Sequence, residues 1–220
     1  MAETTRRLEV WDLPTRLVHW ALVVLVFLAW LSQEFGQMDR HMMIGYTILT
    51  LVLFRIVWGL YGSEPSRFVS FVRGPRAVVA YARDLLRGRP PKLAGHNPLG
   101  ALAIVALLGL LLVQATAGLF ADDDIFTQGP LAKLVSSETS SMLTNVHETV
   151  FWVLLGVIAV HVAAAAAYAG LLKQDLVRPM IHGRKTLPAD TAAPSVRNPL
   201  WALPAAAFAA GVVWYVVNRL

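Results

Sequence analysis

Two histidines at the ends of one apolar stretch have a spacing that suits a pair of cofactor ligands. The stretch HETVFWVLLGVIAVH runs from His147 to His161 and has almost no polar residue between its ends. Fourteen residues of α-helix rise about 21 Å and make nearly four turns, so both imidazoles would project from nearly the same helix face. Arg55 follows His41 by the same interval in a second apolar stretch. The spacing therefore predicts polar groups at two depths of one helix bundle.

The residue types limit the chemistry that such sites can carry. The 220 residues include six histidines and no cysteine, which excludes disulfides, thiolate-bound zinc, iron–sulfur clusters and haem attached through a C-x-x-C-H motif. A bare metal ion would need three or four protein ligands. A haem iron needs only axial ligands, and two histidines complete it. Histidine pairs inside a helix bundle therefore favour non-covalent, b-type haem.

The composition indicates a membrane protein. Hydrophobic residues make up 56% of the chain and charged residues 15%, against about 45–50% and about 25% in average soluble domains. A membrane-spanning helix needs about 20 mostly apolar residues. Five stretches are predicted to span, the last of them containing Pro204: Leu17–Leu31, Met42–Leu60, Leu99–Phe120, Val146–Leu172 and Leu200–Val217.

The basic residues predict the orientation of these spans. Of the 19 lysines and arginines, fifteen precede the first span, lie between the second and third, or follow the fourth, and only three lie on the opposite side. Because loops rich in Lys and Arg stay in the cytoplasm, we expect a cytoplasmic N-terminus. The net charge of +5 is explained by this topology, and no nucleic-acid partner is expected.

This orientation sorts the histidines by depth. His41 and His147 fall near the outer surface, and His19 and His161 fall toward the cytoplasmic side. We therefore expect two transverse sites, one formed by each pair, with these four histidines as metal ligands. His96, at the inner start of the third span, is the rival inner ligand; alternatively it caps that helix, contacts a propionate or lines a quinone pocket.

Other residues are candidates for contacts with the cofactor. Arg55 is costly inside a span and would pair well with a haem propionate, although it could instead reach lipid headgroups. Gly45, one turn after His41, either makes room for a porphyrin or packs as an ordinary small residue. Arg16 completes the candidate cofactor-binding set. Glu148 could accept a proton or could be an exposed interfacial carboxylate.

The connections between the spans also carry predictions. The segment Gly74–Gly88 has Val78, Tyr81 and Leu85 on one side and arginines on another, which predicts a short amphipathic helix at the membrane surface. His182 is expected in a loop after the fourth span. We divide the chain into a di-haem domain (1–185), a linker (186–198) and an additional C-terminal transmembrane segment (199–220).

Four stretches of the chain resemble one family. They are VWDLPTRLVHW, HMMIGYTILTLVLFRIVWGLYGS, FVRGPRAVVAYARDLLRGRPPKLAGHNPLG and LVRPMIHGRK. Together, over about residues 8–185, they resemble the prokaryotic cytochrome b561 family, which are bacterial di-haem membrane cytochromes related to the cytochrome b subunits of nickel–iron hydrogenases. The resemblance implies an all-α four-helix bundle in the bacterial inner membrane. It also implies two bis-histidine b haems whose ligands match His19, His41, His147 and His161, and electron exchange with quinone.

The expected function is electron transfer across the membrane through two haems, between quinone or quinol and a periplasmic partner such as a c-type cytochrome. The acidic outer loop at 121–145 could dock such a partner. A membrane-anchoring cytochrome b subunit of a dehydrogenase or hydrogenase complex and, from the resemblance, a superoxide:quinone oxidoreductase are the alternatives. A histidine-lined transporter is disfavoured, because transporters place their sites near the midplane. A homodimer is left open.

Overall fold

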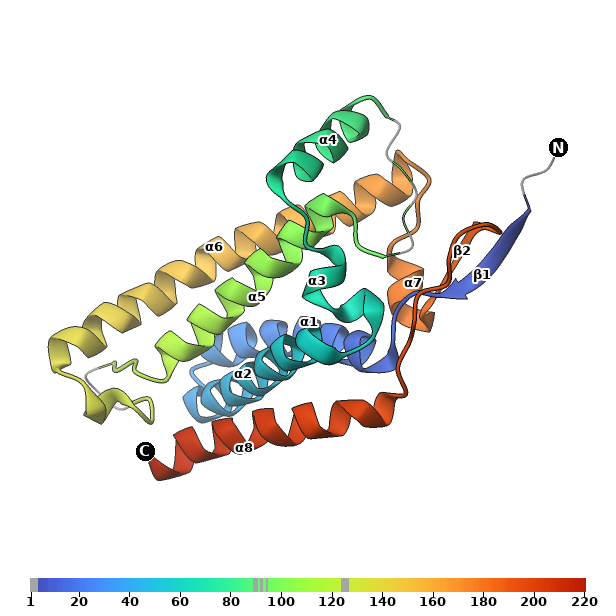
Figure 1. Cartoon of the computed structure of the whole chain (residues 1–220). Helices are drawn as coiled ribbons and strands as arrows, with labels where there is room; N and C mark the ends of the chain where they lie inside the picture. The colour runs from blue at the N-terminus through green and yellow to red at the C-terminus, as the bar shows by residue number, and fades with distance from the viewer. Residues whose placement is uncertain (1–3, 89–90, 92, 94, 124–126) are drawn as a thin grey trace. The chain divides into compact units, whose positions relative to one another are not determined.

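The computed structural model describes residues 4–88, 91, 93, 95–123 and 127–220, and it is all-α apart from two short strands. Five of its helices are long and apolar enough to cross a membrane, which confirms the five predicted spans and the fold class (Figure 1). These helices are α1 (Leu13–Glu34), α2 (Met38–Tyr61), α5 (Pro98–Gly118), α6 (Ser137–Gly170) and α8 (Leu203–Arg219), the last preceded directly by the 3-10 turn η3 (Pro199–Ala202).

Short elements fill the connections. They are β1 (Thr5–Glu9), the 3-10 turn η1 (Glu64–Ser66), α3 (Phe68–Phe71), α4 (Pro75–Leu86), the 3-10 turn η2 (Ala132–Leu134), α7 (Val177–His182) and β2 (Arg184–Pro188). The predicted amphipathic helix is confirmed as α4. It starts at a proline, which suits the first turn, and it is followed by Gly88, whose positive φ of 70° suits a glycine.

The strands β1 and β2 form an antiparallel pair that the sequence did not lead us to expect. Their register runs from Thr5 opposite Pro188 to Glu9 opposite Arg184. Just beyond the pair, the carbonyl oxygen of Gly183 accepts hydrogen bonds from the N–H groups of Val10 and Trp11. The strands are short and largely charged, so they lack the alternating apolar pattern that identifies a half-buried strand.

The chain divides into two compact units. One unit comprises Met1–Leu17, Val57–Ala106 and Ala159–Ala202, and the other comprises Val18–Ile56, Leu107–Ile158 and Leu203–Leu220. We call them the sheet unit and the helical unit, after their contents. The sequence-based division at residues 185 and 198 is a different partition and stays a prediction.

The helical unit has an apolar core to which α1, α2, α5 and α6 all contribute. Its buried centre consists of Ile48, Val52, Leu111 and Leu154, with side chains of α1 packed against them. Ile48 lies halfway between His41 and Arg55, and Leu154 lies halfway between His147 and His161. A packed apolar layer therefore occupies the middle of both fourteen-residue intervals.

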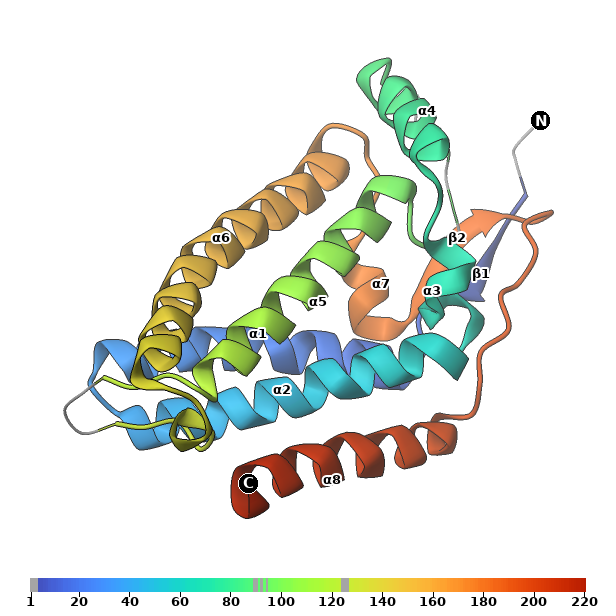
Figure 2. The ribbon, with the colours of Figure 1, turned by 60° about the vertical axis from the view of Figure 1, so that its left-hand side comes forward.

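The helix α8 packs on the helical unit along one stripe. Ala205, Ala209 and Val213, spaced four residues apart, are buried. Val213 belongs to an apolar cluster with Leu49 of α2 and with two leucines that follow α5. Both ribbon views show α8 running beside α2 (Figure 2). The fifth segment is thus packed against the chain's own helices along one side.

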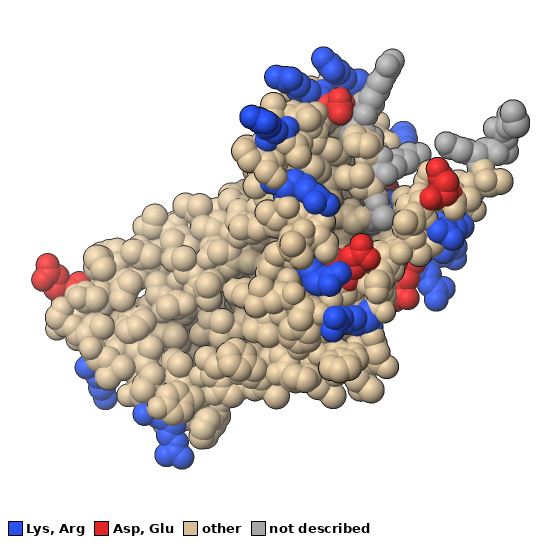
Figure 3. Space-filling model, viewed as in Figure 1, with Lys and Arg blue, Asp and Glu red and all other residues tan. Residues whose placement is uncertain are grey.

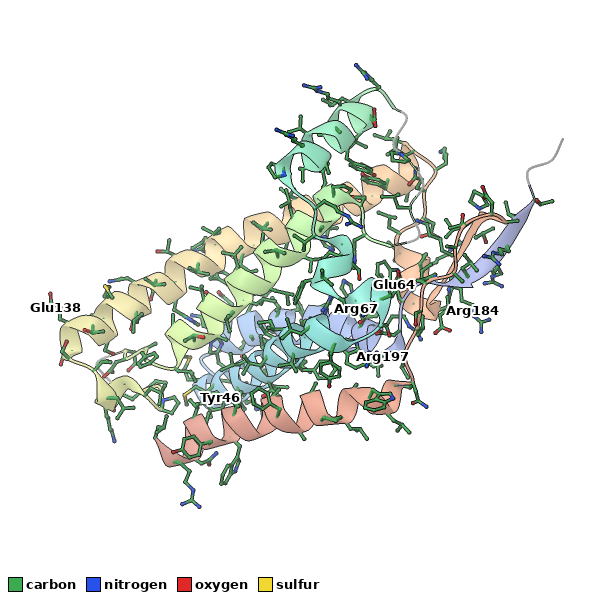
Figure 4. All side chains as sticks on the ribbon, viewed as in Figure 1. Tyr46, Glu64, Arg67, Glu138, Arg184 and Arg197 are labelled. Atoms are coloured by element: carbon green, nitrogen blue, oxygen red, sulfur yellow. The ribbon has the colours of Figure 1, made fainter. Side chains whose placement is uncertain are left out.

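The sheet unit is held by a small apolar cluster and by the segment that leads to α8. Leu8, Val10, Trp11 and Leu187 form the cluster around the strands. In the connecting segment, the backbone of Ser195 exchanges hydrogen bonds with Glu64, and the Arg197 N–H donates to Ser63 Oγ. Figure 4 labels Glu64 and Arg197 at this junction.

Helix α6 begins earlier than the predicted fourth span. It starts at Ser137, nine residues before Val146. Ser136 caps this start, because its hydroxyl accepts a hydrogen bond from the Thr139 N–H. The first turns of α6 are polar. A hydropathy pattern detects only apolar helix, so it did not indicate that these turns are helical. Part of the expected outer loop is therefore helical.

Candidate functional site

The structure brings His41 and His147 together in the helical unit. His41 lies in the first turn of α2 and His147 lies about three turns into α6. Their ring centres are 6.1 Å apart, and the two ring planes are nearly perpendicular, at 83°. Both side chains are half-buried. The predicted outer pair is therefore adjacent across two helices that are distant in the sequence.

Backbone carbonyls orient both imidazoles. His41 Nδ1 lies 2.9 Å from the carbonyl oxygen of Ala29 in α1, and His147 Nδ1 lies 2.8 Å from the carbonyl oxygen of Gln114 in α5. A carbonyl oxygen can only accept, so each Nδ1 carries the proton and donates it. Each Nε2 then holds a lone pair, which is the state in which an imidazole ligates a metal.

Helix α5 shapes the surroundings of His147 through two further residues. The side-chain nitrogen of Gln114 lies 3.2 Å from His147 Nε2, consistent with donation to that lone pair. The Gln114 Oε1 atom is buried, and none of the residues that the structure describes forms a hydrogen bond with it. A Cβ atom at Gly118 would lie 2.9 Å from Cε1 of His147, so only glycine leaves room for the ring in this position.

Gln114 and Gly118 were not predicted from the sequence. Gln114 had a readable signal, because an amide within an otherwise apolar span needs a polar partner. Gly118 had none, because many helices of membrane proteins contain glycine for ordinary packing. The carbonyls of Ala29 and Gln114 were equally unreadable, since every residue carries one.

The outer pair fits axial ligation of a haem. An imidazole nitrogen lies about 2.0–2.1 Å from a metal that it ligates, so two imidazoles on opposite sides of one metal have ring centres roughly 6–6.5 Å apart. The observed 6.1 Å lies in this range. Within the described part of the chain, no third His or carboxylate joins a cluster that could hold a bare ion. Space is open around Gly45, where an added Cβ would meet nothing within 4 Å.

Arg55 is placed as predicted on α2, in the helical unit, and it is only 6% exposed. A buried guanidinium is costly unless it is paired and hydrogen-bonded. The apolar layer around Ile48 separates its position along α2 from that of His41. Its contact with a propionate stays a prediction.

The inner histidines lie in different units. His19 belongs to the helical unit, where it is half-buried and meets Trp20 edge to face at 5.1 Å. His161 belongs to the sheet unit and its side chain is exposed on α6. The pairing of His19 with His161 therefore stays a prediction.

His96 lies between aromatic rings of the sheet unit. Its ring centre is 4.3 Å from that of Trp11 and 4.6 Å from that of Phe71. The alternative that His96 caps α5 is wrong, because the side chain of Asn97 accepts the hydrogen bond from the Gly100 N–H. The histidine just before the cap instead packs against two rings. The other proposed roles of His96, as a haem ligand, a propionate contact or a quinone contact, stay predictions.

Arg16 joins α1 to α7. Its guanidinium donates a hydrogen bond to the carbonyl oxygen of Ile181 and lies against Gly183. His182, which we expected in a loop, is the last residue of α7. Glu148, beside His147, is exposed. The structure thus gives Arg16 an architectural contact, and its contact with a cofactor stays a prediction.

A second polar cluster is enclosed in the sheet unit. Asp12, 1% exposed, accepts a hydrogen bond from the Thr15 N–H at the start of α1. Its other carboxylate oxygen accepts from Trp58 Nε1 at 3.1 Å and from the Ser66 hydroxyl at 2.7 Å. Burial raises the pKa of Asp12, but the hydrogen bonds from Ser63, Thr15 and Ser66 outweigh burial and lower the pKa below that of an ordinary aspartate. Asp12 is therefore a buried carboxylate that stays ionised at neutral pH.

The comparisons with known proteins agree with this geometry. The family model of prokaryotic cytochrome b561 matches residues 10–183. Neither the curated proteins nor the solved structures give a match. Helices that span a membrane and a histidine pair suited to haem define a membrane cytochrome b. The chain belongs to the prokaryotic cytochrome b561 family, and with that family it shares b-type haem binding and haem-based electron transfer in the membrane.

Proposed function

We propose that this protein carries electrons across the bacterial inner membrane through two b haems, each held by two histidines. The observation that carries the proposal is the outer pair: His41 and His147 lie 6.1 Å apart, and each donates its Nδ1 proton to a backbone carbonyl. Four groups from four helices thus hold two neighbouring imidazoles, each with a lone pair on its Nε2. This is how preorganised ligands are held by their surroundings.

The protein's own residues would hold and orient the cofactors. His41 and His147 would hold the outer haem, and His19 and His161 the inner one, with Arg55 paired to a propionate of the inner haem. When bound, the haems supply one-electron chemistry. With two histidines holding each haem iron, the protein would leave no ligand position for oxygen, which favours electron transfer over oxygen binding.

The apolar layer in the helical unit supports the proposal of two separate haem sites. Ile48 and Leu154 pack together at the midpoints of the intervals that start at His41 and His147. A tightly packed layer there keeps water and polar groups away from the space between the two depths. It also fixes the helices at the same height, so the fourteen-residue spacing on each helix would be retained in the folded protein.

Quinone or quinol and a periplasmic redox protein such as a c-type cytochrome are the proposed partners. The proposed orientation, with a cytoplasmic N-terminus, follows from the excess of Lys and Arg in the connections on one side. It places the His41–His147 pair toward the periplasm. The outer haem would therefore exchange electrons with the soluble partner.

The visible spectrum and the haem content of the purified protein test this proposal. We expect b-type bands and two haems for each chain in the wild type. His41→Ala or His147→Ala should each remove one haem, and His19→Ala or His161→Ala should each remove the other. His182→Ala is a matched control and should keep both. A single haem, or a haem lost with His96→Ala but kept with His19→Ala, would contradict the assignment of the inner ligands.

A further inference from the structure

The helix α4 has one side packed against its own unit. Tyr81 is buried, and its hydroxyl shares a hydrogen bond of 2.9 Å with the hydroxyl of Tyr168 in α6. The amide of Asn97, which caps α5, donates to the same Tyr168 hydroxyl. Burial and the Tyr168 hydroxyl raise the pKa of Tyr81, so the Tyr81 phenol stays protonated at neutral pH. This contact fixes the rotation of α4 about its own axis.

The opposite side of α4 carries a stripe of arginines. Arg76, Arg83 and Arg87 are all exposed, and at 3.6 residues per turn they fall within roughly 40° of one another around the helix. Among the residues that the structure describes, none forms an ion pair with them. Figure 3 shows Lys and Arg side chains, in blue, gathered over α4.

Two apolar side chains lie next to this stripe. Val79 is 50% exposed and Leu86 is 89% exposed, two turns further along the helix. The apolar residues of α4 are therefore divided in the structure: Tyr81 is buried, whereas Val79 and Leu86 are exposed. An exposed apolar stripe beside arginines is the pattern of a helix that lies in a membrane interface.

The place of α4 in the chain agrees with this pattern. It lies in the connection between the spanning helices α2 and α5, both of which must reach the same membrane surface there. Arginine binds phosphate through two parallel hydrogen bonds, and anionic headgroups attract basic segments that lie close to the surface. The charge of the arginines and the exposure of the apolar side chains therefore both indicate anionic lipid as the ligand of α4.

We propose that α4 is a binding surface for anionic phospholipid headgroups. Arg76, Arg83 and Arg87 bind the phosphates, and Val79 and Leu86 enter the boundary between headgroups and acyl chains. The Tyr81–Tyr168 contact presents this surface in a fixed orientation, so the arginines do not depend on lipid for their alignment. The proposal concerns lipid and is independent of the haem ligands.

Depth measurements on the full chain test the apolar stripe. The chain has no cysteine, so Leu86→Cys and Ala80→Cys each allow one nitroxide label, both at exposed positions of α4. In vesicles of phosphatidylcholine and phosphatidylglycerol, the label at residue 86 should collide with oxygen dissolved in the lipid and be shielded from a nickel chelate in water. The label at residue 80 should show the reverse. Equal exposure of both labels to water would overturn the proposal.

Lipid retention tests the arginine stripe. Native mass spectrometry of protein extracted from the same vesicles should find phosphatidylglycerol retained several-fold over phosphatidylcholine. The triple variant Arg76→Gln, Arg83→Gln, Arg87→Gln should retain both lipids equally. A triple variant at exposed arginines elsewhere, Arg7→Gln, Arg178→Gln, Arg184→Gln, should retain the wild-type preference. Unchanged haem bands and melting temperature would show that the variants fold.

Competition separates lipid from other ligands. Addition of inorganic phosphate at moderate ionic strength should leave the retained phosphatidylglycerol in place, because free phosphate lacks the acyl chains that Val79 and Leu86 contact. Release by phosphate would show that the arginines bind a soluble phosphate compound, and this would overturn the lipid assignment. Equal retention in the α4 variant and the wild type would overturn it as well.

Discussion

The outer histidine pair and the Asp12 cluster show two ways in which a membrane protein encloses polar groups. Around Asp12, both carboxylate oxygens accept hydrogen bonds from the protein itself. At the histidine pair, backbone carbonyls accept from both Nδ1 atoms, which leaves a lone pair on each Nε2, and the Gln114 amide lies 3.2 Å from Nε2 of His147. One cluster is complete without a ligand, whereas the other is prepared for one.

This difference distinguishes a structural cluster from a binding site within one protein. A closed network stabilises the fold, because each buried group already has its partner. A binding site keeps part of its hydrogen-bonding or ligating capacity unused and holds it in position from behind. We therefore expect changes at Asp12 to alter stability, and changes around His147 to alter haem binding with little effect on stability.

The largest expected effect follows Asp12→Ala. This change removes the cap of α1 and leaves Trp58 Nε1–H buried without the carboxylate that accepts from it, whereas the Ser66 hydroxyl keeps the Thr15 hydroxyl as a partner. A lost cap costs about 1 kcal/mol and an unsatisfied buried donor about 1–3 kcal/mol, so we expect a loss of roughly 2–4 kcal/mol. Thermal unfolding of the purified protein, followed by circular dichroism, measures it.

Thr15→Val provides the control for this change. It removes one hydroxyl from the cluster but leaves the carboxylate and the cap in place, so the loss should be much smaller. The molecules of the Asp12 variant that do fold should carry the wild-type haem content. A variant of normal stability that lacks haem would contradict the distinction between the two clusters.

The next effect in size concerns Gly118. Gly118→Ala places a methyl group against the His147 ring, and the ring must leave its carbonyl partner or move away from His41. Disturbing the group that orients a ligand typically costs 10–100-fold in metal affinity, so we expect roughly a tenfold weaker outer haem, measured by haem titration of the apoprotein.

Gly109→Ala is the matched control, because it lies on the same helix and its added methyl group would meet nothing within 4 Å. It should leave haem binding unchanged and stabilise the helix slightly. If both alanine variants bound haem alike, the close approach of Gly118 to His147 would have no role in the site.

Some features of the fold and of the site could be predicted from the sequence, and others could not. The five spans and the family follow from compositional signals and motifs within the chain, whereas the depths of the histidines stay a prediction. The closeness of His41 and His147, which the structure confirms, was expected from the predicted topology, in which both lie near one surface. The fold class and the adjacency of His41 and His147 could therefore be predicted from patterns within one sequence.

The unpredicted features depend on contacts between distant segments. Asp12 before Leu13 and Pro14 has the form of a helix cap, but nothing near it in the sequence indicates Trp58 or Ser66 as its partners. The strand pair of β1 and β2 joins the two ends of the family region and has no apolar alternation. Backbone carbonyls that orient a histidine have no residue signature, so the support of a site is less predictable than its ligands.

The smallest expected effect is the pH dependence that Asp12 confers. Hydrogen bonds hold the pKa of Asp12 in the folded protein below the value of an unfolded aspartate, which is about 3.9. The folded state therefore favours the ionised form, and this contribution to stability is fully present above the unfolded pKa. It is lost as the pH falls through the folded pKa, because the carboxyl group must then be protonated in both states. Between about pH 5 and pH 3, the melting temperature of the wild type should fall more steeply than that of Asp12→Asn, which cannot titrate. Parallel melting curves would show that Asp12 is not held ionised by its neighbours, and the cluster would then be less complete than its hydrogen bonds indicate.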